Sequence, residues 1–339
     1  RRSWKDSLKL EGVKAHNLKN LTVAFPLDTL TVITGVSGSG KSTLVREVLH
    51  PALSRALDIP AKVPGSFVQL TGDLSKVTQV EMIDQNPIGK SSRSNPVTYV
   101  KAYDAIRQLF ASQGLAQQRK YKPALFSFNV DGGRCEECLG EGLVRIEMQF
   151  MADIQLTCES CQGKRFKDEI LEVEYQGKNI ADVLELTVDS SIEFFAGHKA
   201  LIRKLKPLQD VGLGYITLGQ SSNSLSGGEA QRVKLASFLG KTSSDLQQHA
   251  VFIFDEPTTG LHYHDIRKLL DALNALIEQG KTVLVIEHNL EIIKSADWVI
   301  DLGPEGGEHG GRLCFAGIPE DLIKLKTNHT AQYLRQKLS

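Results

Sequence analysis

Residues 31–43, TVITGVSGSGKST, combine the residue types that bind a nucleoside triphosphate. An apolar stretch leads into a glycine-rich loop, and Gly35-x-x-x-x-Gly40-Lys41-Ser42 ends where helical periodicity begins. Glycines let backbone N–H groups turn toward phosphates, and the amino end of the following helix adds favourable partial charge. We predict a nucleotide site here, with Lys41 at the β- and γ-phosphates. The residues expected to bind are Gly35, Ser37, Gly38, Gly40, Lys41, Ser42 and Thr43.

Two further apolar stretches end in residues that could activate water. VFIFDE (251–256) reads as a buried parallel strand, so its two acids would lie at the carboxyl edge of a sheet. We expect Asp255 to hold Mg²⁺ together with Ser42, and Glu256 to act as general base. TVLVIEH (282–288) ends in His288, which could reach the γ-phosphate. An acidic strand cap and a structural histidine are the simpler alternatives.

SLSGGEAQRVKLASFL (224–239) contains a second anion-binding pattern at the start of a helix. Ser226, Gly227 and Gly228 offer a hydroxyl and bare backbone amides. One chain folding around one nucleotide has no need of two such sites, whereas a lobe that closes over ATP held by another lobe does. This order of motifs resembles the ATP-binding cassette (ABC) superfamily, and Gln85, after VEMID, is then a candidate γ-phosphate sensor.

Composition limits the remaining possibilities. The 339 residues contain 40 basic and 40 acidic side chains, so net charge does not indicate a polyanionic partner. No apolar run approaches the roughly 20 residues needed to cross a bilayer, and we expect a cytoplasmic protein without a membrane partner. Paired cysteines in that compartment more often bind metal than form disulfides.

Four cysteines form the pattern C-x2-C-x19-C-x2-C, which is typical of a tetrahedral zinc site. A redox motif would need only one pair. Four thiolates leave no open position on the ion, so we expect a structural role for zinc and a hairpin between the two pairs. The predicted ligands are Cys135, Cys138, Cys158 and Cys161.

Several segments resemble the C-terminal half of UvrA-family proteins more closely than they resemble other ABC proteins. They include DQNPIGKSSRSNPVTY, FSFNVDGGRCEEC, DVGLGYITLGQ, LSGGEAQRVKLA, FDEPTTGLH and IDLGPEGGEHGG. The resemblance covers nearly the whole chain. It implies an α/β ABC-type ATPase lobe interrupted by a mostly helical signature subdomain that carries a zinc hairpin.

The resemblance also implies a function. Members of the UvrA family are damage-sensing ATPases of bacterial nucleotide excision repair, use ATP, Mg²⁺ and Zn²⁺, and have no nuclease activity of their own. Expected partners are damaged or distorted double-stranded DNA, a second ABC half and other excision-repair proteins.

A cluster of basic residues fits a DNA partner. Residues 90–122 hold seven Lys or Arg side chains and one acid, with aromatic residues such as Tyr103 and Phe110 interleaved. A local positive excess can neutralise phosphates without reading sequence, although a solvated helical face would look the same. The candidates for DNA contact are Lys90, Arg93, Lys101, Arg107, Arg119, Lys120, Lys122, Lys164, Arg165 and Lys167.

The expected domains are an ATPase lobe in two parts (1–89 and 224–339), a signature subdomain in two parts (90–134 and 162–223) and a zinc module (135–161). Three alternatives remain open. A transport or drug-resistance cassette would share the nucleotide motifs but need no four-cysteine site. A chromosome-maintenance ATPase would carry long heptads, which the chain lacks. A zinc-organised interaction module could use ATP only as a conformational ligand.

Overall fold

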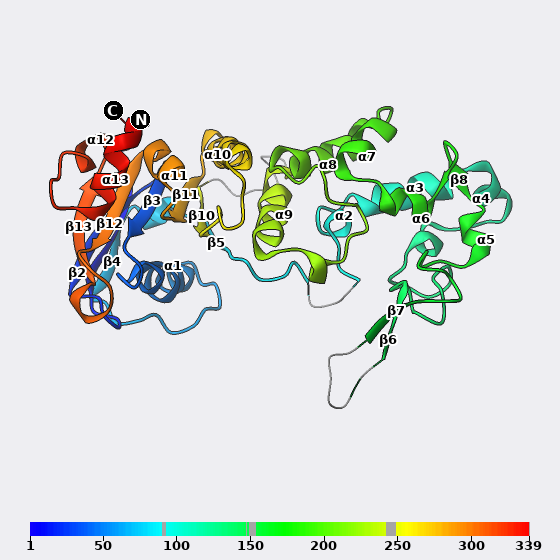
Figure 1. Cartoon of the computed structure of the whole chain (residues 1–339), viewed down its shortest axis with the longest axis horizontal. Coiled ribbons are helices and arrows are strands. Elements are labelled where there is room, and N and C mark those ends of the chain that lie inside the picture. Colours follow the sequence, from blue (N-terminus) through cyan, green and yellow to red (C-terminus); the bar gives the residue numbers. More distant parts are fainter. Residues whose placement is uncertain (90–92, 147, 149–153, 242–248, 339) are drawn as a thin grey trace. The chain divides into compact units, whose positions relative to one another are not determined.

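The computed structural model describes residues 1–89, 93–146, 148, 154–241 and 249–338 (Figure 1). The chain divides into two compact units. Unit 1 comprises Arg1–Gln85 and Lys241–Ser339, and unit 2 comprises Asn86–Gly240. Within the described residues, no helix combines the length and the apolar character needed to cross a membrane.

Unit 1 contains a six-stranded sheet of order β13-β12-β3-β11-β10-β5. Neighbouring strands are parallel except for the antiparallel pair β12 and β13. The central strands β10 and β11 are buried almost throughout, as expected for apolar parallel strands covered on both faces. The strands are β3 (Leu30–Gly35), β5 (Gln79–Ile83), β10 (Ala250–Asp255), β11 (Thr282–Ile286), β12 (Trp298–Gly303) and β13 (Arg312–Gly317).

The register of these strands brings the sequence motifs to one edge of the sheet. Asp255 lies opposite Ile286, and Ile286 lies opposite Ile33. On the other side of β10, Phe254 lies opposite Ile83. The phosphate loop after β3, the acids after β10, the histidine after β11 and the glutamine after β5 therefore all follow the carboxyl ends of parallel strands.

A three-stranded antiparallel sheet of order β2-β1-β4 completes the core of unit 1. Its strands are β1 (Ser7–Val13), β2 (Leu21–Pro26) and β4 (Gln69–Gly72). Phe25 from this sheet, Val45 from the helix after the phosphate loop and Ile253 from β10 belong to one buried apolar cluster. The helices of unit 1 are η1 (Thr43–Leu49), α1 (His50–Ala56), η2 (Leu74–Lys76), α10 (Tyr263–Glu278), α11 (Leu290–Ser295), η5 (Gly307–His309), α12 (Pro319–Leu322) and α13 (His329–Leu338).

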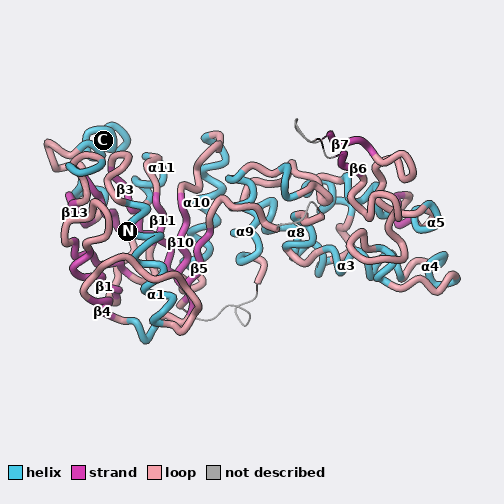
Figure 2. The backbone as a smooth tube through the Cα atoms, turned by 90° about the horizontal axis from the view of Figure 1, so that it is seen from below, coloured by secondary structure: helices cyan, strands magenta, loops and turns pink. Residues whose placement is uncertain are grey.

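Helices, joined by loops, are the main regular elements of unit 2, as Figure 2 shows. The segment 192–212, whose sequence has helical periodicity, forms parts of two helices. The chain leaves helical geometry between Phe194 and Lys199, where Gly197 and His198 intervene, and His198 has φ −111° and ψ 75°. The helices of unit 2 are α2 (Pro96–Tyr99), α3 (Tyr103–Ala111), α4 (Gly114–Gln118), η3 (Pro123–Phe126), α5 (Asp168–Leu171), α6 (Ile180–Glu185), α7 (Val188–Phe194), α8 (Lys199–Asp210), η4 (Ser222–Ser224) and α9 (Gly227–Leu239).

Two small antiparallel pairs complete unit 2: β6 (Leu143–Ile146) with β7 (Ile154–Thr157), and β8 (Glu174–Tyr175) with β9 (Lys178–Asn179). Strands β6 and β7 form the hairpin expected between the cysteine pairs. Helix α9 belongs to unit 2, whereas the sequence boundaries place residues 224–240 in the ATPase lobe. A backbone hydrogen bond of 2.7 Å from Ser222 to Ser94 ties the segment before α9 to the segment before α2.

Candidate functional site

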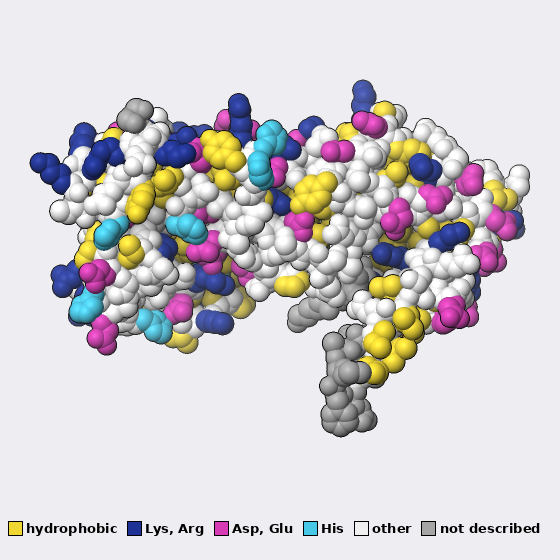
Figure 3. All heavy atoms as spheres, viewed as in Figure 1, with side chains coloured by type: hydrophobic (Ala, Val, Ile, Leu, Met, Phe, Trp, Pro, Cys, Tyr) yellow, Lys and Arg dark blue, Asp and Glu magenta, His cyan; other side chains and the backbone are white. Residues whose placement is uncertain are grey.

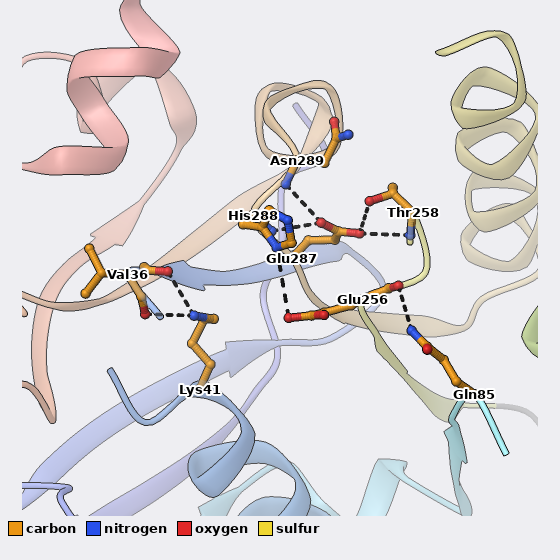
Figure 4. Close-up of polar contacts among 9 residues, drawn as sticks. Val36, Lys41, Gln85, Glu256, Thr258, Glu287, His288 and Asn289 are labelled. Atoms are coloured by element: carbon orange, nitrogen blue, oxygen red, sulfur yellow. Dashed lines mark hydrogen bonds and ion pairs between the residues drawn. The ribbon is translucent and has the colours of Figure 1, made fainter. Parts of the chain in front are cut away.

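The phosphate loop follows β3 with a backbone that requires glycine. Gly35 has φ +130°, and a Cβ atom there would lie 1.9 Å from the Leu302 carbonyl oxygen of β12. The Lys41 ammonium donates hydrogen bonds of 2.9 Å to the carbonyls of Gly35 and Val36 (Figure 4). The Lys41 side chain therefore points back into the phosphate loop, where the phosphates of a nucleotide would bind.

Electrostatics around Lys41 reflect the acids gathered at this edge. Burial lowers the pKa of Lys41, and the nearby carboxylates of Glu256, Asp301 and Asp255 oppose that shift. The Ser42 side chain is exposed and makes no capping hydrogen bond to the helix that begins at Thr43. Its hydroxyl could thus serve a cation, as the sequence predicts.

The two acids at the end of β10, Asp255 and Glu256, differ in environment. Burial raises the pKa of Asp255, and the guanidinium of Arg46, 2.9 Å from its carboxylate, opposes the shift. Glu256 has φ +46°, an uncommon conformation for a residue other than glycine, and its N–H donates to the Ile286 carbonyl at 2.9 Å. The Glu256 side chain is 45% exposed, so it is open to solvent.

Gln85 and His288 meet Glu256 from two neighbouring strands. The Gln85 side-chain amide donates to the Glu256 carbonyl at 3.2 Å. The Nδ1 atom of His288 lies 4.0 Å from a Glu256 carboxylate oxygen. Figure 4 shows Gln85 and His288 each in contact with Glu256 at the carboxyl edge of the sheet, with Lys41 on the same edge and turned toward the Val36 carbonyl. The structure therefore brings together the side chains that the sequence assigns to hydrolysis.

Sequence reasoning assigned no role to two buried acids. Glu287 is fully buried and accepts hydrogen bonds from the Thr258 N–H, two residues after Glu256, and from the His288 N–H. Asp301 on β12 accepts from Thr330 at 2.7 Å. Each lies in an apolar strand segment, where an acid is uncommon. That is the signal that could have identified them.

The signature segment lies in unit 2 and forms a complete capping box. The Ser226 N–H donates to a Glu229 carboxylate oxygen at 2.7 Å, and the Glu229 N–H donates to the Ser226 hydroxyl at 3.3 Å. Gly227 and Gly228 form the first turn of α9. The Tyr215 hydroxyl holds the other Glu229 oxygen at 2.5 Å. These hydrogen bonds fix the conformation of the first turn of α9, which carries the backbone amides of Gly227 and Gly228.

The four cysteines of unit 2 converge. All are buried, and their sulfurs lie within 4.8 Å of one another. Cys135 and Cys158 have sulfurs 3.8 Å apart, and Cys138 and Cys161 have sulfurs 3.6 Å apart. Sulfurs bound tetrahedrally to zinc at about 2.3 Å lie about 3.8 Å apart, so the cluster has the right size.

Backbone amides complete this arrangement. The Gly142 N–H donates to the Cys138 sulfur at 3.2 Å, and the Arg165 N–H donates to the Cys161 sulfur at 3.4 Å. Such bonds orient metal-binding thiolates. Gly140, in the first turn, has φ +85°, and a Cβ atom there would lie 2.0 Å from the Phe128 carbonyl oxygen.

The basic residues proposed for DNA contact fall into three groups. Arg107, Arg119 and Lys167 form ion pairs with Asp104, Glu172 and Glu136, so their charge is partly neutralised. Arg93 donates to the Leu139 carbonyl at 3.4 Å, and the Arg165 guanidinium lies 5.5 Å from the centre of the Phe128 ring. The exposed lysines, which form no ion pair within the described part of the chain, are Lys101, Lys120, Lys122 and Lys164. Lys90 lies outside the described residues.

The aromatic part of the DNA interpretation needs correction. Tyr103 is buried and donates its hydroxyl to the Phe126 carbonyl at 2.7 Å, and Phe110 is also buried. Both rings belong to the core rather than to a stacking surface. Figure 3 shows basic and acidic side chains interspersed on the visible face of unit 2, with apolar side chains gathered near the hairpin. The hairpin exposes the apolar side chains of Leu143 (41%), Ile146 (44%) and Leu156 (50%).

The fold and the site define an ABC-type P-loop ATPase lobe with an inserted helical unit that carries a cysteine cluster. No family model matches the chain. The chain is 51% identical over 331 residues to UvrABC system protein A of Clostridium perfringens, and 52% identical to that of Staphylococcus epidermidis. Each alignment covers 98% of this chain and 35% of the relative.

A solved structure gives the same result. The chain aligns over its full length with UvrA2 from Deinococcus radiodurans, with 47% identity and a TM-score of 0.91, and covers 40% of that protein. The chain belongs to the UvrA family and spans about a third of the length of the curated relatives it matches.

Proposed function

We propose that the chain is the ATP-hydrolysing second half of a DNA-damage-recognition ATPase of nucleotide excision repair. The supporting observation is the convergence of Lys41, Asp255 and Glu256 with Gln85 and His288 at one sheet edge, in a chain homologous to UvrABC system protein A over 98% of its length. By resemblance to the UvrA family, the proposal assigns the chain no nuclease activity of its own.

The residues of the site divide the work of hydrolysis. Lys41 and the backbone of the phosphate loop would bind the β- and γ-phosphates. Glu256 would accept a proton from the attacking water. The oxygen of that water would form a bond to the γ-phosphorus, while the bond between the γ-phosphorus and the oxygen of the β-phosphate breaks. His288 and Gln85 would orient the γ-phosphate and that water.

Two metals fit the residues present. Ser42 and Asp255 would hold Mg²⁺, which neutralises phosphate charge when bound. The Arg46 guanidinium, 2.9 Å from the largely buried Asp255 carboxylate, supports the proposal of a cation at this position. The four cysteine sulfurs would hold Zn²⁺ in a closed, structural site, as their spacing of 3.6 and 3.8 Å supports.

Three kinds of macromolecular partner follow from the same proposal. Ser226, Gly227 and Gly228 would contact ATP bound by a second ABC half, so hydrolysis would occur at composite sites. Distorted duplex DNA would be bound through its phosphates, without recognition of the base sequence. ATP hydrolysis would control the affinity for this DNA. Other repair proteins would receive the DNA from the assembled complex.

The DNA part is tested with three exposed lysines. Replacing Lys120, Lys122 and Lys164 together by Ala should weaken binding to a damaged duplex about 10- to 100-fold and reduce the salt dependence of log K by about 2 to 3. The matched control replaces the exposed lysines Lys14, Lys62 and Lys326, which lie in unit 1. Equal effects of the two triple variants on affinity and on salt slope would contradict the assignment.

The ATPase part is tested by the rate of phosphate release with and without damaged duplex. We expect a DNA-dependent change in rate. Absence of both hydrolysis and DNA binding by the chain would overturn the proposal.

A further inference from the structure

We propose that Glu287 is a positioning residue for ATP hydrolysis, because it holds together the two loops that carry Glu256 and His288. The inference rests on the proposed ATPase function and adds a residue to it. Glu287 directly follows β11 and immediately precedes His288. It is fully buried and is not itself a ligand of the reacting groups.

One Glu287 oxygen binds the loop after β10. It accepts the Thr258 N–H at 2.9 Å and the Thr258 hydroxyl at 2.5 Å. Thr258 follows Glu256 by two residues. Because Glu256 is also held by a backbone bond from its own N–H to Ile286, the loop is fixed on both sides of the general base.

The other Glu287 oxygen binds the loop after β11. It accepts the N–H groups of His288 at 2.8 Å and Asn289 at 2.9 Å. Figure 4 shows this carboxylate lying between the Thr258 segment and the His288–Asn289 segment. One side chain therefore determines the separation of two backbones whose side chains would act on the same γ-phosphate.

The chemistry of the partners explains why this position requires a carboxylate. A carboxylate only accepts hydrogen bonds and offers about four lone-pair sites, and here four donors fill them. A buried charge is tolerated only when it is satisfied in this way. A glutamine would turn an NH₂ group toward one of the two donor pairs, so one loop would lose its anchor.

If Glu287 only stabilised the fold, its replacement would have the same effects as the replacement of another buried carboxylate of unit 1. Asp297 provides the comparison, since it is also buried and accepts the Arg2 N–H and the Leu30 N–H, each at 2.9 Å. Leu30 begins β3, so Asp297 lies at the amino edge of the sheet, away from the phosphate loop. It matches Glu287 in burial and in charge but not in position.

The test compares Glu287→Gln with Asp297→Asn, measuring kcat, nucleotide Kd and amide hydrogen exchange below the Tm of both variants. We expect Glu287→Gln to lower kcat about 10- to 100-fold while the nucleotide Kd changes less than about threefold. The amides of Thr258, His288 and Asn289 should exchange faster. Asp297→Asn should lower the Tm but leave kcat and these amides unchanged.

Two additional variants separate positioning from general destabilisation. Thr258→Val removes the hydroxyl but keeps the N–H, so kcat should fall only about threefold. The double variant Glu287→Gln with His288→Ala should lower kcat by less than the product of the two single reductions. The reason is that both residues act on the position of the same imidazole.

Normal kcat in Glu287→Gln, with a wild-type chain that hydrolyses ATP, would overturn this inference alone. A loss of nucleotide affinity in parallel with kcat would do the same. A wild-type chain without ATPase activity would remove the proposed function, and this inference with it.

Discussion

The Arg46 guanidinium lies 2.9 Å from a carboxylate oxygen of Asp255, although 209 residues separate them in the sequence. Arg46 belongs to the helix that follows the phosphate loop, and Asp255 ends β10. The arginine therefore occupies the carboxylate that would hold Mg²⁺. A Mg²⁺ ion held by Asp255, as proposed, would compete with Arg46 for this carboxylate.

Replacing Arg46 by Gln should lower the Mg²⁺ concentration needed for half-maximal ATP binding by up to about fivefold. The limit follows because partly exposed ion pairs contribute about 0–1 kcal/mol. The measurement is a Mg²⁺ titration of fluorescent ATP binding. Arg55→Gln, an exposed change on α1, is the control and should not move the midpoint. A higher midpoint in Arg46→Gln would contradict competition.

Replacing Glu256 by Gln should preserve ATP binding and slow turnover about 10²- to 10⁴-fold, because a neutral amide cannot accept the proton of water. Nucleotide Kd and single-turnover rate are measured on the same preparation. Glu278→Gln changes an exposed acid at the end of α10 and should leave both values unchanged. Normal turnover in Glu256→Gln would exclude the general-base assignment.

Replacing Cys158 by Ala should abolish the binding of about one zinc ion per chain and lower the Tm of unit 2, since a four-thiolate site contributes directly to folding. ATP binding should persist, because the phosphate loop and Asp255 lie in unit 1. Cys314→Ala removes the fifth cysteine, which lies on β13, and should retain the metal. Metal analysis and calorimetry measure the two effects. Full zinc content in Cys158→Ala would rule out this ligand set.

The capping box predicts a pH effect on unit 2. Burial acts to raise the pKa of Glu229, but hydrogen bonds from Tyr215 and Ser226 outweigh it and lower the pKa. Because the folded pKa lies below the unfolded one, this stabilisation is complete above the unfolded pKa and is lost as pH falls through the folded pKa. Tyr215→Phe should therefore cost about 0.5–1.5 kcal/mol at neutral pH, and less in acid.

Acid unfolding curves of Tyr215→Phe and Tyr333→Phe check this effect. Tyr333 is exposed on α13 of unit 1, so its replacement should leave the curve of unit 2 unchanged. An effect of Tyr215→Phe that grows as the pH falls would have the wrong sign for the proposed cause.

Much of the nucleotide site could be predicted from local sequence. Gly35, Lys41 and Ser42 act through a loop whose shape depends on glycines close in the chain. The acids after β10 and the histidine after β11 follow apolar runs long enough to mark buried strands. Since parallel strands end at a common edge, these runs also predicted that the residues would converge.

The DNA-contact residues were harder to assign, because charge in a sequence does not show which partners neutralise it. Arg119 reads as a free cation but pairs with Glu172, 53 residues away. Tyr103 reads as an exposed aromatic residue, yet its ring is buried. Both outcomes depend on how helices pack, which short-range patterns do not contain.

By itself the sequence determined the phosphate loop, the spacing of the four cysteines and the strand-end acids, because these features depend on residues close in the chain. Only the tertiary structure decided that Arg46 pairs with Asp255 and that Glu287 joins Thr258 to the His288 loop. The reason is physical. A buried charge must find donors among whatever groups the sheet register brings near it, and that register is set by the packing of the whole core.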